Sequence, residues 1–229
     1  MKKIVFLLIN AVLFCSCSQN QSNTNLTVAN DSLVLAETQT DNYQLEGLYA
    51  PSFILSCIDS QQIVLKNESK KLDSLYKVLL PNAYQGQTIY VKLNGILFSK
   101  NGKATAFLVN DVLVAEQKNE KNTCFAYDYW CMGNEPFWRV QVSEKENLID
   151  FFNPMEAKFY HFVYTKPQDK GKSKVYVSEN STESHKIKVT ITNGNCSDGM
   201  SEREYIYSSQ VELDGHVFNG CAVSSSQNK

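Results

Sequence analysis

The stretch TIYVKLNGILF, residues 88–98, decides the fold of the first half of this 229-residue chain. Every second residue from 89 to 93 is aliphatic, which is the period-two pattern of a half-buried β-strand. Gly95 then allows a bulge or bend, and Asn101-Gly102 is typical of a tight hairpin turn. We therefore expect residues 104–116 to form a last strand pair or one long bent strand.

A helix is predicted before this strand, because four apolar residues fall at i, i+3, i+4 and i+7 and Pro81 ends the pattern. Residues 62–66 form a short strand, and residues 43–57 form one long strand or two strands joined by a bend at Pro51. We expect residues 43–122 to form a small five-stranded OB barrel. In that fold, strands are followed by a helix and then by further strands, which is the order predicted here. The helical residues are Leu72, Leu75, Tyr76 and Leu79.

The first half of the chain also carries a set of residues that resembles a known domain type. Tyr49, Phe53 and Cys57 precede the helix, Leu75-Tyr76 lies on it, and residues 86–95 follow it. In these features roughly 75 residues resemble the C-terminal OB-type domain of NlpE-like envelope lipoproteins. The resemblance implies a role in sensing envelope stress, copper or surface contact. A copper role does not carry over, because the CxxC motif of that family's N-terminal half is missing.

The second half of the chain, residues 123–224, is predicted to be an antiparallel β domain. Short alternating segments follow one another closely, and Asp214-Gly215 indicates a tight hairpin between the last two. This spacing is typical of an antiparallel β-barrel or sandwich, so the whole chain is expected to be mostly β. The expected strands are residues 139–142, 149–152, 159–164, 174–177, 187–192, 205–213 and 217–223.

Three motifs in this half occur in a fixed order. They are GNEPFW at residues 133–138, CSDGMSER at 196–203 and GCA at 220–222. Together they resemble a family of uncharacterised bacterial lipoproteins with a GNEPFW opening, a C-x-DGMSD loop and a terminal GCA. Glu202 stands where that family has Asp. The resemblance implies a domain type and no particular reaction.

The N-terminal residues have the pattern of a bacterial lipoprotein signal peptide. Lys2 and Lys3 precede an apolar run, residues 4–14, that is shorter than the ~20 residues needed to span a bilayer. Cys17 follows a small residue, as a lipidated cysteine does, although Phe14 stands where leucine is usual. The alternatives are an ordinary secretory signal or a buried N-terminal strand.

We therefore expect residues 1–16 to be a cleaved signal peptide and Cys17 to carry acyl chains such as palmitate. The polar residues 17–42 then form a flexible tether, and residues 225–229 form a short tail. This predicts an anchored protein of the bacterial cell envelope, in the outer membrane facing the periplasm. The formal net charge of −2 gives no basic excess, so we do not expect nucleic acid as a partner.

Five cysteines remain after signal cleavage and acylation, and an oxidising envelope compartment favours disulfides. We expect Cys196 to pair with Cys221, which closes the intervening loop onto the last strand. Cys57 is expected to pair with Cys124, and Cys124 with Cys131 is the competing pair. Cys131 is then left as a buried thiol, with a redox-sensing or intermolecular role as the alternative.

No hydrolase, metalloprotease, phosphate-loop or dinucleotide-binding motif occurs, and the three histidines match no metal-ligand spacing, so no cofactor or metal is expected. The leading hypothesis is a non-enzymatic binding or envelope-stress sensing module. It would contact an envelope protein or small ligand through a barrel mouth lined by the Glu135 and Asp198 loops. One alternative is a hydrolase or enzyme inhibitor that uses the same loops, and a third option is a purely structural scaffold. The candidate residues are Glu135, Trp138, Asp198, Met200, Ser201 and Arg203.

These residues also have a structural interpretation, which we favour. Glu135 would accept hydrogen bonds from the backbone or from Arg203, while Phe137 and Trp138 close one barrel end. The aromatic run FAYDYW, residues 125–130, is expected to be a wedge packed between the domains. If it were exposed, it would be a recognition patch for peptide or glycan.

Overall fold

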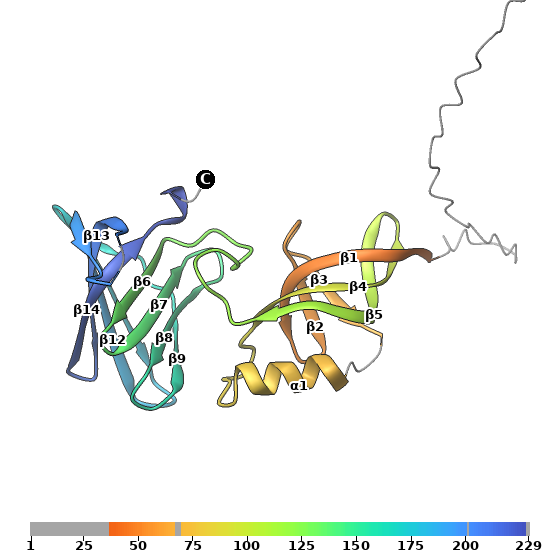
Figure 1. Ribbon diagram of the computed structural model, residues 1–229, viewed down its shortest axis with the longest axis horizontal. Coiled ribbons are helices and arrows are strands. Elements are labelled where there is room, and N and C mark those ends of the chain that lie inside the picture. The colour runs from red at the N-terminus through yellow and green to blue at the C-terminus, as the bar shows by residue number, and fades with distance from the viewer. Residues whose placement is uncertain (1–36, 67–69, 201, 228–229) are drawn as a thin grey trace, which may run out of the picture.

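A computed structural model describes residues 37–66, 70–200 and 202–227. The chain forms two β domains side by side, joined by one linker (Figure 1). The expected signal peptide, Cys17 and Ser201 lie outside the described residues. The mostly-β fold, with a five-stranded barrel followed by a second antiparallel β domain, is confirmed.

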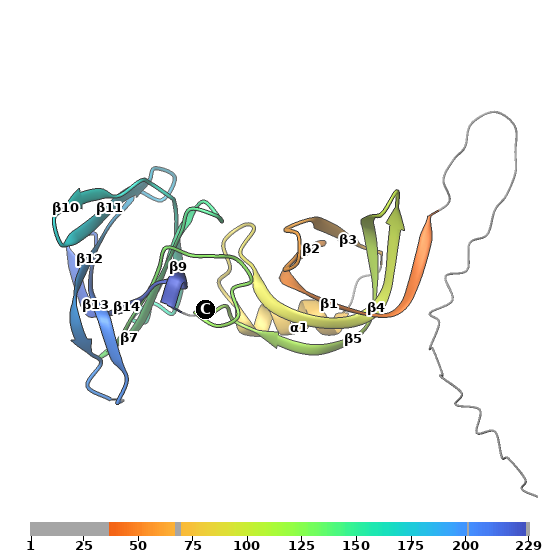
Figure 2. The same cartoon turned by 90° about the horizontal axis from the view of Figure 1, so that it is seen from above.

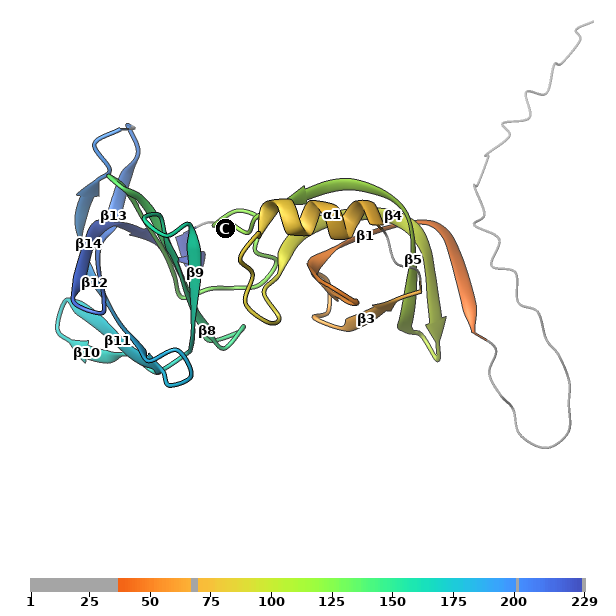
Figure 3. The ribbon, with the colours of Figure 1, turned by 90° about the horizontal axis from the view of Figure 1, so that it is seen from below.

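The first domain is a closed barrel with the strand order β1-β2-β3-β5-β4, which is the order of an OB fold. A parallel pairing between β3 and β5 completes the ring, and the bend expected at Pro51 separates β1 from β2. The helix α1 lies across one end of the barrel (Figures 1 and 3). The elements are β1 (Thr38–Ala50), β2 (Phe53–Ser56), β3 (Gln62–Leu65), α1 (Lys70–Leu79), β4 (Ile89–Lys100) and β5 (Lys103–Glu116).

Strand β1 begins earlier than the sequence predicts. Residues 38–42 were expected to belong to the tether, yet Thr38 already pairs with Ser99 of β4. The reason is the length of the β4–β5 hairpin, which turns at Asn101-Gly102 and presents backbone groups that β1 pairs with. A register shift between Thr40 and Tyr43 lets the long strand follow the curved hairpin.

The second domain is one curled antiparallel sheet with the strand order β10-β11-β12-β13-β14-β6-β7-β8-β9. The last strand β14 pairs with the first strand β6, and side-chain hydrogen bonds such as Ser178 Oγ to the Val163 carbonyl bridge the seam between β11 and β9. Figures 2 and 3 show the sheet curling around its interior. The strands are β6 (Tyr129–Asn134), β7 (Phe137–Ser143), β8 (Leu148–Asn153), β9 (Lys158–Val163), β10 (Gln168–Lys170), β11 (Ser173–Asn180), β12 (His185–Ser197), β13 (Glu204–Leu213) and β14 (His216–Val223), followed by a 3-10 turn, η1 (Ser225–Gln227).

The interior of this sheet is filled by aromatic and aliphatic side chains around Trp138. The Trp138 ring packs near Phe151 and Phe218, with ring centroids 6.3 and 6.1 Å away. Two glycines make room for it: a Cβ at Gly133 would lie 2.1 Å from Trp138 Nε1, and one at Gly220 would lie 2.9 Å from the ring. The first and third sequence motifs therefore form one packing unit.

A second, smaller core covers the outer face of the same sheet. Because side chains alternate along a strand, Trp130 points outward where Tyr129 and Cys131 point inward. The hairpin between β12 and β13 folds back over this face, and Tyr205 packs there with Trp130 and Tyr127. The middle motif, at residues 196–203, therefore covers the outside of the domain.

The glycine at position 220 should be essential for the stability of the second domain. We expect Gly220→Ala to lower the free energy of unfolding by about 1–3 kcal/mol, because the new Cβ would lie 2.1 Å from the Met132 carbonyl oxygen. Urea unfolding followed by tryptophan fluorescence measures this, since both tryptophans lie in this domain. Gly194→Ala, which adds a Cβ in open space, is the control. Equal stability of the two variants would contradict the packing role.

Candidate functional site

The two loops expected to line a barrel mouth do meet, but on the outer face of the second domain. Asn134 Nδ2 donates to the Asp198 carbonyl oxygen at 3.0 Å. The Asp198 carboxylate accepts hydrogen bonds from the Met200 backbone N–H at 3.0 Å and the Tyr205 hydroxyl at 3.2 Å, so it holds its own loop together. The packing of Tyr205 with Trp130 and Tyr127 places the base of this hairpin on the outer face of the sheet. A barrel mouth lined by these loops stays a prediction.

The remaining candidate residues separate into different environments. Trp138 is buried, while Phe137 is 65% exposed and Met200 66% exposed, so Phe137 does not help to close the barrel. Glu135 is exposed at the β6–β7 turn. Arg203 approaches Glu120 at 3.7 Å and lies over the Tyr205 ring, and no bond between Arg203 and Glu135 is found among the described residues.

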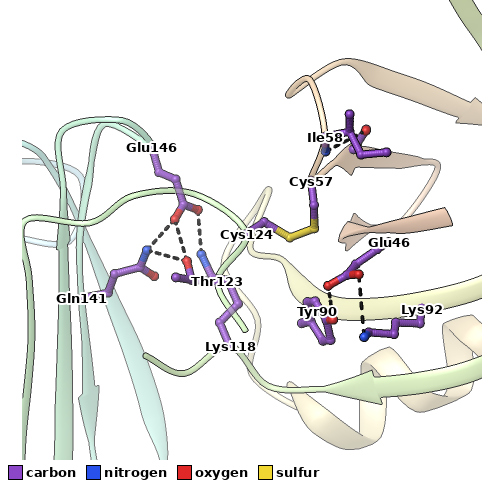
Figure 4. The surroundings of a disulfide bond; sticks show 11 residues. Glu46, Cys57, Ile58, Tyr90, Lys92, Lys118, Thr123, Cys124, Gln141 and Glu146 are labelled. Carbon is purple, nitrogen blue, oxygen red and sulfur yellow. Dashed lines mark hydrogen bonds and ion pairs between the residues drawn. A yellow bond between two sulfur atoms is a disulfide. The ribbon is translucent and has the colours of Figure 1, made fainter. Parts of the chain in front are cut away.

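Both expected disulfides are confirmed, and the competing Cys124–Cys131 pair is not formed. Cys196–Cys221 fastens the β12–β13 hairpin to β14. Cys57–Cys124 joins the OB barrel to the linker that leaves it (Figure 4). The Cys131 thiol is free and buried in the inner core, where burial raises its pKa to about 12. It is packed as a small apolar side chain.

A buried ion pair fixes the linker against the second domain. Lys118 Nζ lies 2.8 Å from Glu146 Oε2, and the two side chains are only 8% and 10% exposed. The other Glu146 oxygen accepts hydrogen bonds from the Thr123 hydroxyl and the Gln141 amide (Figure 4). Because every oxygen of this carboxylate is occupied, the charge is tolerated in the interior. The linker, the β7–β8 turn and β7 are thereby held together.

A second set of contacts joins the α1–β4 loop of the barrel to β8 and β9. The Tyr84 hydroxyl donates to Asp150, and the Tyr84 ring stacks on His161 with centroids 4.5 Å apart. His161 Nδ1 lies 2.7 Å from the other Asp150 oxygen. Burial raises the pKa of Tyr84 well above its usual value, so the phenol remains a donor at neutral pH. The two domains are therefore joined by a contact outside the linker as well.

A cleft of about 990 Å³ opens between the barrel and the linker, beside the Cys57–Cys124 disulfide. The barrel wall carries Glu46, whose carboxylate accepts a hydrogen bond from the Tyr90 hydroxyl and lies 3.7 Å from Lys92 Nζ (Figure 4). Ile58, 80% exposed, lies at the cleft. The opposite wall is formed by residues 120–127 of the linker and by Ser225 and Ser226.

One edge of β1 is open where it reaches this cleft. Strand β2 pairs with β1 only from Gly47 onward, and the Cys57 N–H donates to the Glu46 carbonyl. Backbone groups of alternate residues point to the same side of a strand, so the N–H and C=O of Gln44 also point toward the β2 side. Among the described strands, none pairs with β1 on that side before Gly47.

Sequence reasoning missed most of the residues that form this cleft and joint. Glu46, Lys92, Lys118 and Glu146 are ordinary surface types in the sequence, and no local spacing connects them. The one available signal was Cys124, since a disulfide from Cys57 necessarily places the linker beside the barrel. The aromatic run 125–130 is partly the expected wedge: Tyr127 and Trp130 are buried, but residues 129–134 are also the unexpected strand β6.

Comparison of the chain with protein-family models, with curated proteins and with solved structures found no match. The two resemblances drawn from the motifs therefore stay predictions. Within the described residues, no helix is long and apolar enough to cross a membrane. The same residues contain no group of three or more His, Cys, Asp or Glu side chains placed to hold a metal ion.

The Lys118–Glu146 pair should carry much of the stability of the joint. We expect Lys118→Met to lower the free energy of unfolding by about 3–5 kcal/mol, because it leaves the Glu146 charge buried without its cation. Urea unfolding measures the change. Lys186→Met, which removes a cation from an exposed pair with Glu179, is the control and should unfold like the wild type. An equally small effect of Lys118→Met would contradict this role.

Proposed function

We propose that the protein is a lipid-anchored lipoprotein of the bacterial envelope that binds or senses a partner and does not catalyse a reaction. The anchor is Cys17, acylated after removal of residues 1–16, and the membrane is the outer membrane facing the periplasm. The support is the sequence pattern of the N-terminus, together with two disulfides that suit an oxidising compartment. The likeness to NlpE-like domains supports envelope-stress sensing in the same way.

The observation that carries the binding proposal is the interdomain cleft with the open edge of β1 beside it. An exposed strand edge is the usual template for adding one strand of a partner, because its N–H and C=O groups are free to pair. Exposed Ile58 offers an apolar contact, and the neighbouring Glu46 and Lys92 offer charges of both signs. The cleft suits an extended segment of another envelope protein.

The binding mode is tested by photo-crosslinking in intact envelopes. A photoreactive residue in place of Ile58 should capture a partner, whereas one in place of Val78, equally exposed on α1, should not. Gln44→Pro should abolish the crosslink because it removes an edge N–H, while Gln44→Ala should retain it. Capture that survives Gln44→Pro would contradict strand addition, and no capture at position 58 would contradict binding in the cleft.

The anchor is tested separately. Mass spectrometry of the mature N-terminus should find Cys17 as the first residue with acyl chains attached, and Cys17→Ser should release the protein from membranes on fractionation. The comparison variant is Cys131→Ser, which removes a buried thiol unrelated to the anchor and should stay with the membrane. An unmodified Cys17 in the wild type would overturn the anchoring.

A further inference from the structure

The second domain contains a pocket that none of the sequence motifs predicts. It lies at the end of the curled sheet where β6 and β11 begin, and its volume is about 570 Å³. Buried Tyr129 and Ile191 and partly buried Tyr207 form the floor. Exposed polar residues of the β10–β11 turn and of the end of β12 form the rim. Recesses of this size in barrel mouths are common sites for small ligands.

The floor belongs to a cluster of four tyrosine rings. Tyr129 lies at a ring-centroid distance of 5.3 Å from Tyr207 and 6.3 Å from Tyr176, which in turn lies 6.0 Å from Tyr164. Tyr129 is 8% exposed, yet its hydroxyl has no hydrogen-bond partner within the described part of the chain, and the same holds for Tyr207. The Tyr129 hydroxyl is not fully enclosed by protein atoms, so it reaches the open space of the pocket and is suited to a ligand or solvent partner there.

The rim carries an excess of positive charge. Residues 166–174 contain four lysines and one acid, Asp169, in a chain whose formal net charge is −2. None of these lysines forms an ion pair with another described residue. Lys172 and Lys174 line the pocket. Lys174 pairs across the strands with both Ile191 and Asp169, so the three side chains share the face that points into the mouth.

The approach to the pocket is open. A Cβ at Gly171 or Gly194 would meet no atom within 4 Å, so a ligand can reach the backbone at these rim positions. Asn193 adds a side-chain amide to the rim. The pocket thus combines aromatic rings, hydroxyl and amide groups, a carboxylate and unpaired cations.

We propose that this mouth binds an anionic saccharide, a sugar that carries a carboxylate or phosphate group. The apolar face of a sugar ring packs on Tyr207 and Tyr129, and the phenol hydroxyls hydrogen-bond to sugar hydroxyls. Lys172 and Lys174 bind the anionic group through charge-assisted hydrogen bonds. Asp169 accepts from a sugar hydroxyl and disfavours a simple inorganic anion, which brings negative charge without a donor. The site is separate from the interdomain cleft.

Calorimetric titration of the full chain tests this with an acidic peptide and with three disaccharides of equal size: one neutral, one with a uronic acid and one with a sugar phosphate. We expect binding of at least one anionic disaccharide, weakened by salt, and little binding of the neutral one. Lys174→Gln should weaken the anionic ligand about tenfold. Lys188→Gln, which removes an exposed cation that pairs with Glu212, should leave binding unchanged.

The tyrosines are tested with two substitutions. Tyr207→Ala should abolish binding, and Tyr207→Phe, which keeps the ring and the packing, should weaken it by a smaller factor because one hydroxyl is lost. Circular dichroism in the near ultraviolet checks that both variants remain folded. Equal affinity for the neutral disaccharide, equal affinity for an acidic peptide, or unchanged binding in both Lys174→Gln and Tyr207→Ala would overturn the proposal, as would no binding of any saccharide.

Discussion

The buried ion pair between Lys118 and Glu146 is the constraint on which the arrangement of this protein depends. Both charges are removed from water, so each must keep its partner, and the Thr123 and Gln141 side chains complete the carboxylate's hydrogen bonds. These contacts hold the linker against β7 and the β7–β8 turn. In the same arrangement the Cys57–Cys124 disulfide lies beside the cleft, and Tyr84 of the α1–β4 loop contacts Asp150 and His161 on β8 and β9.

The second domain is organised by a different constraint, the space required by Trp138. Its ring lies in the inner core where Gly133 and Gly220 leave room, so residues far apart in the chain form one packing unit. The loop around Asp198 covers the opposite face and is held by Cys196–Cys221. The most distinctive sequence motifs are thus explained by packing, and the recesses that could bind ligands lie elsewhere.

Local patterns predicted most of the elements correctly. The helix ending before Pro81 and the turns at Asn101-Gly102 and Asp214-Gly215 follow from residue types and spacing. The two disulfides were the expected pairs, with Cys124–Cys131 as the open alternative. Strand β6, with the sequence YWCMGN, was not predicted. Its side chains point alternately into the inner core and into the smaller outer core, and both cores are apolar. A strand that is covered on both faces has no polar face to show the period of two.

The mostly-β class and the order of strands and helix in the OB barrel could be predicted from the sequence, because both follow from local periodicity and turn chemistry. For the cysteines the sequence favoured the observed pairs but left Cys124–Cys131 open, and the structure excludes that pair. Three features arise only when the chain folds, because each joins segments distant in the sequence: the pairing of β14 with β6, the packing of Tyr205 on the outer face and the contact of Lys118 with Glu146. The two recesses also arise only on folding. The walls of both recesses come from segments that are distant in the chain. The surfaces that remain open after packing therefore cannot be predicted from a local sequence pattern.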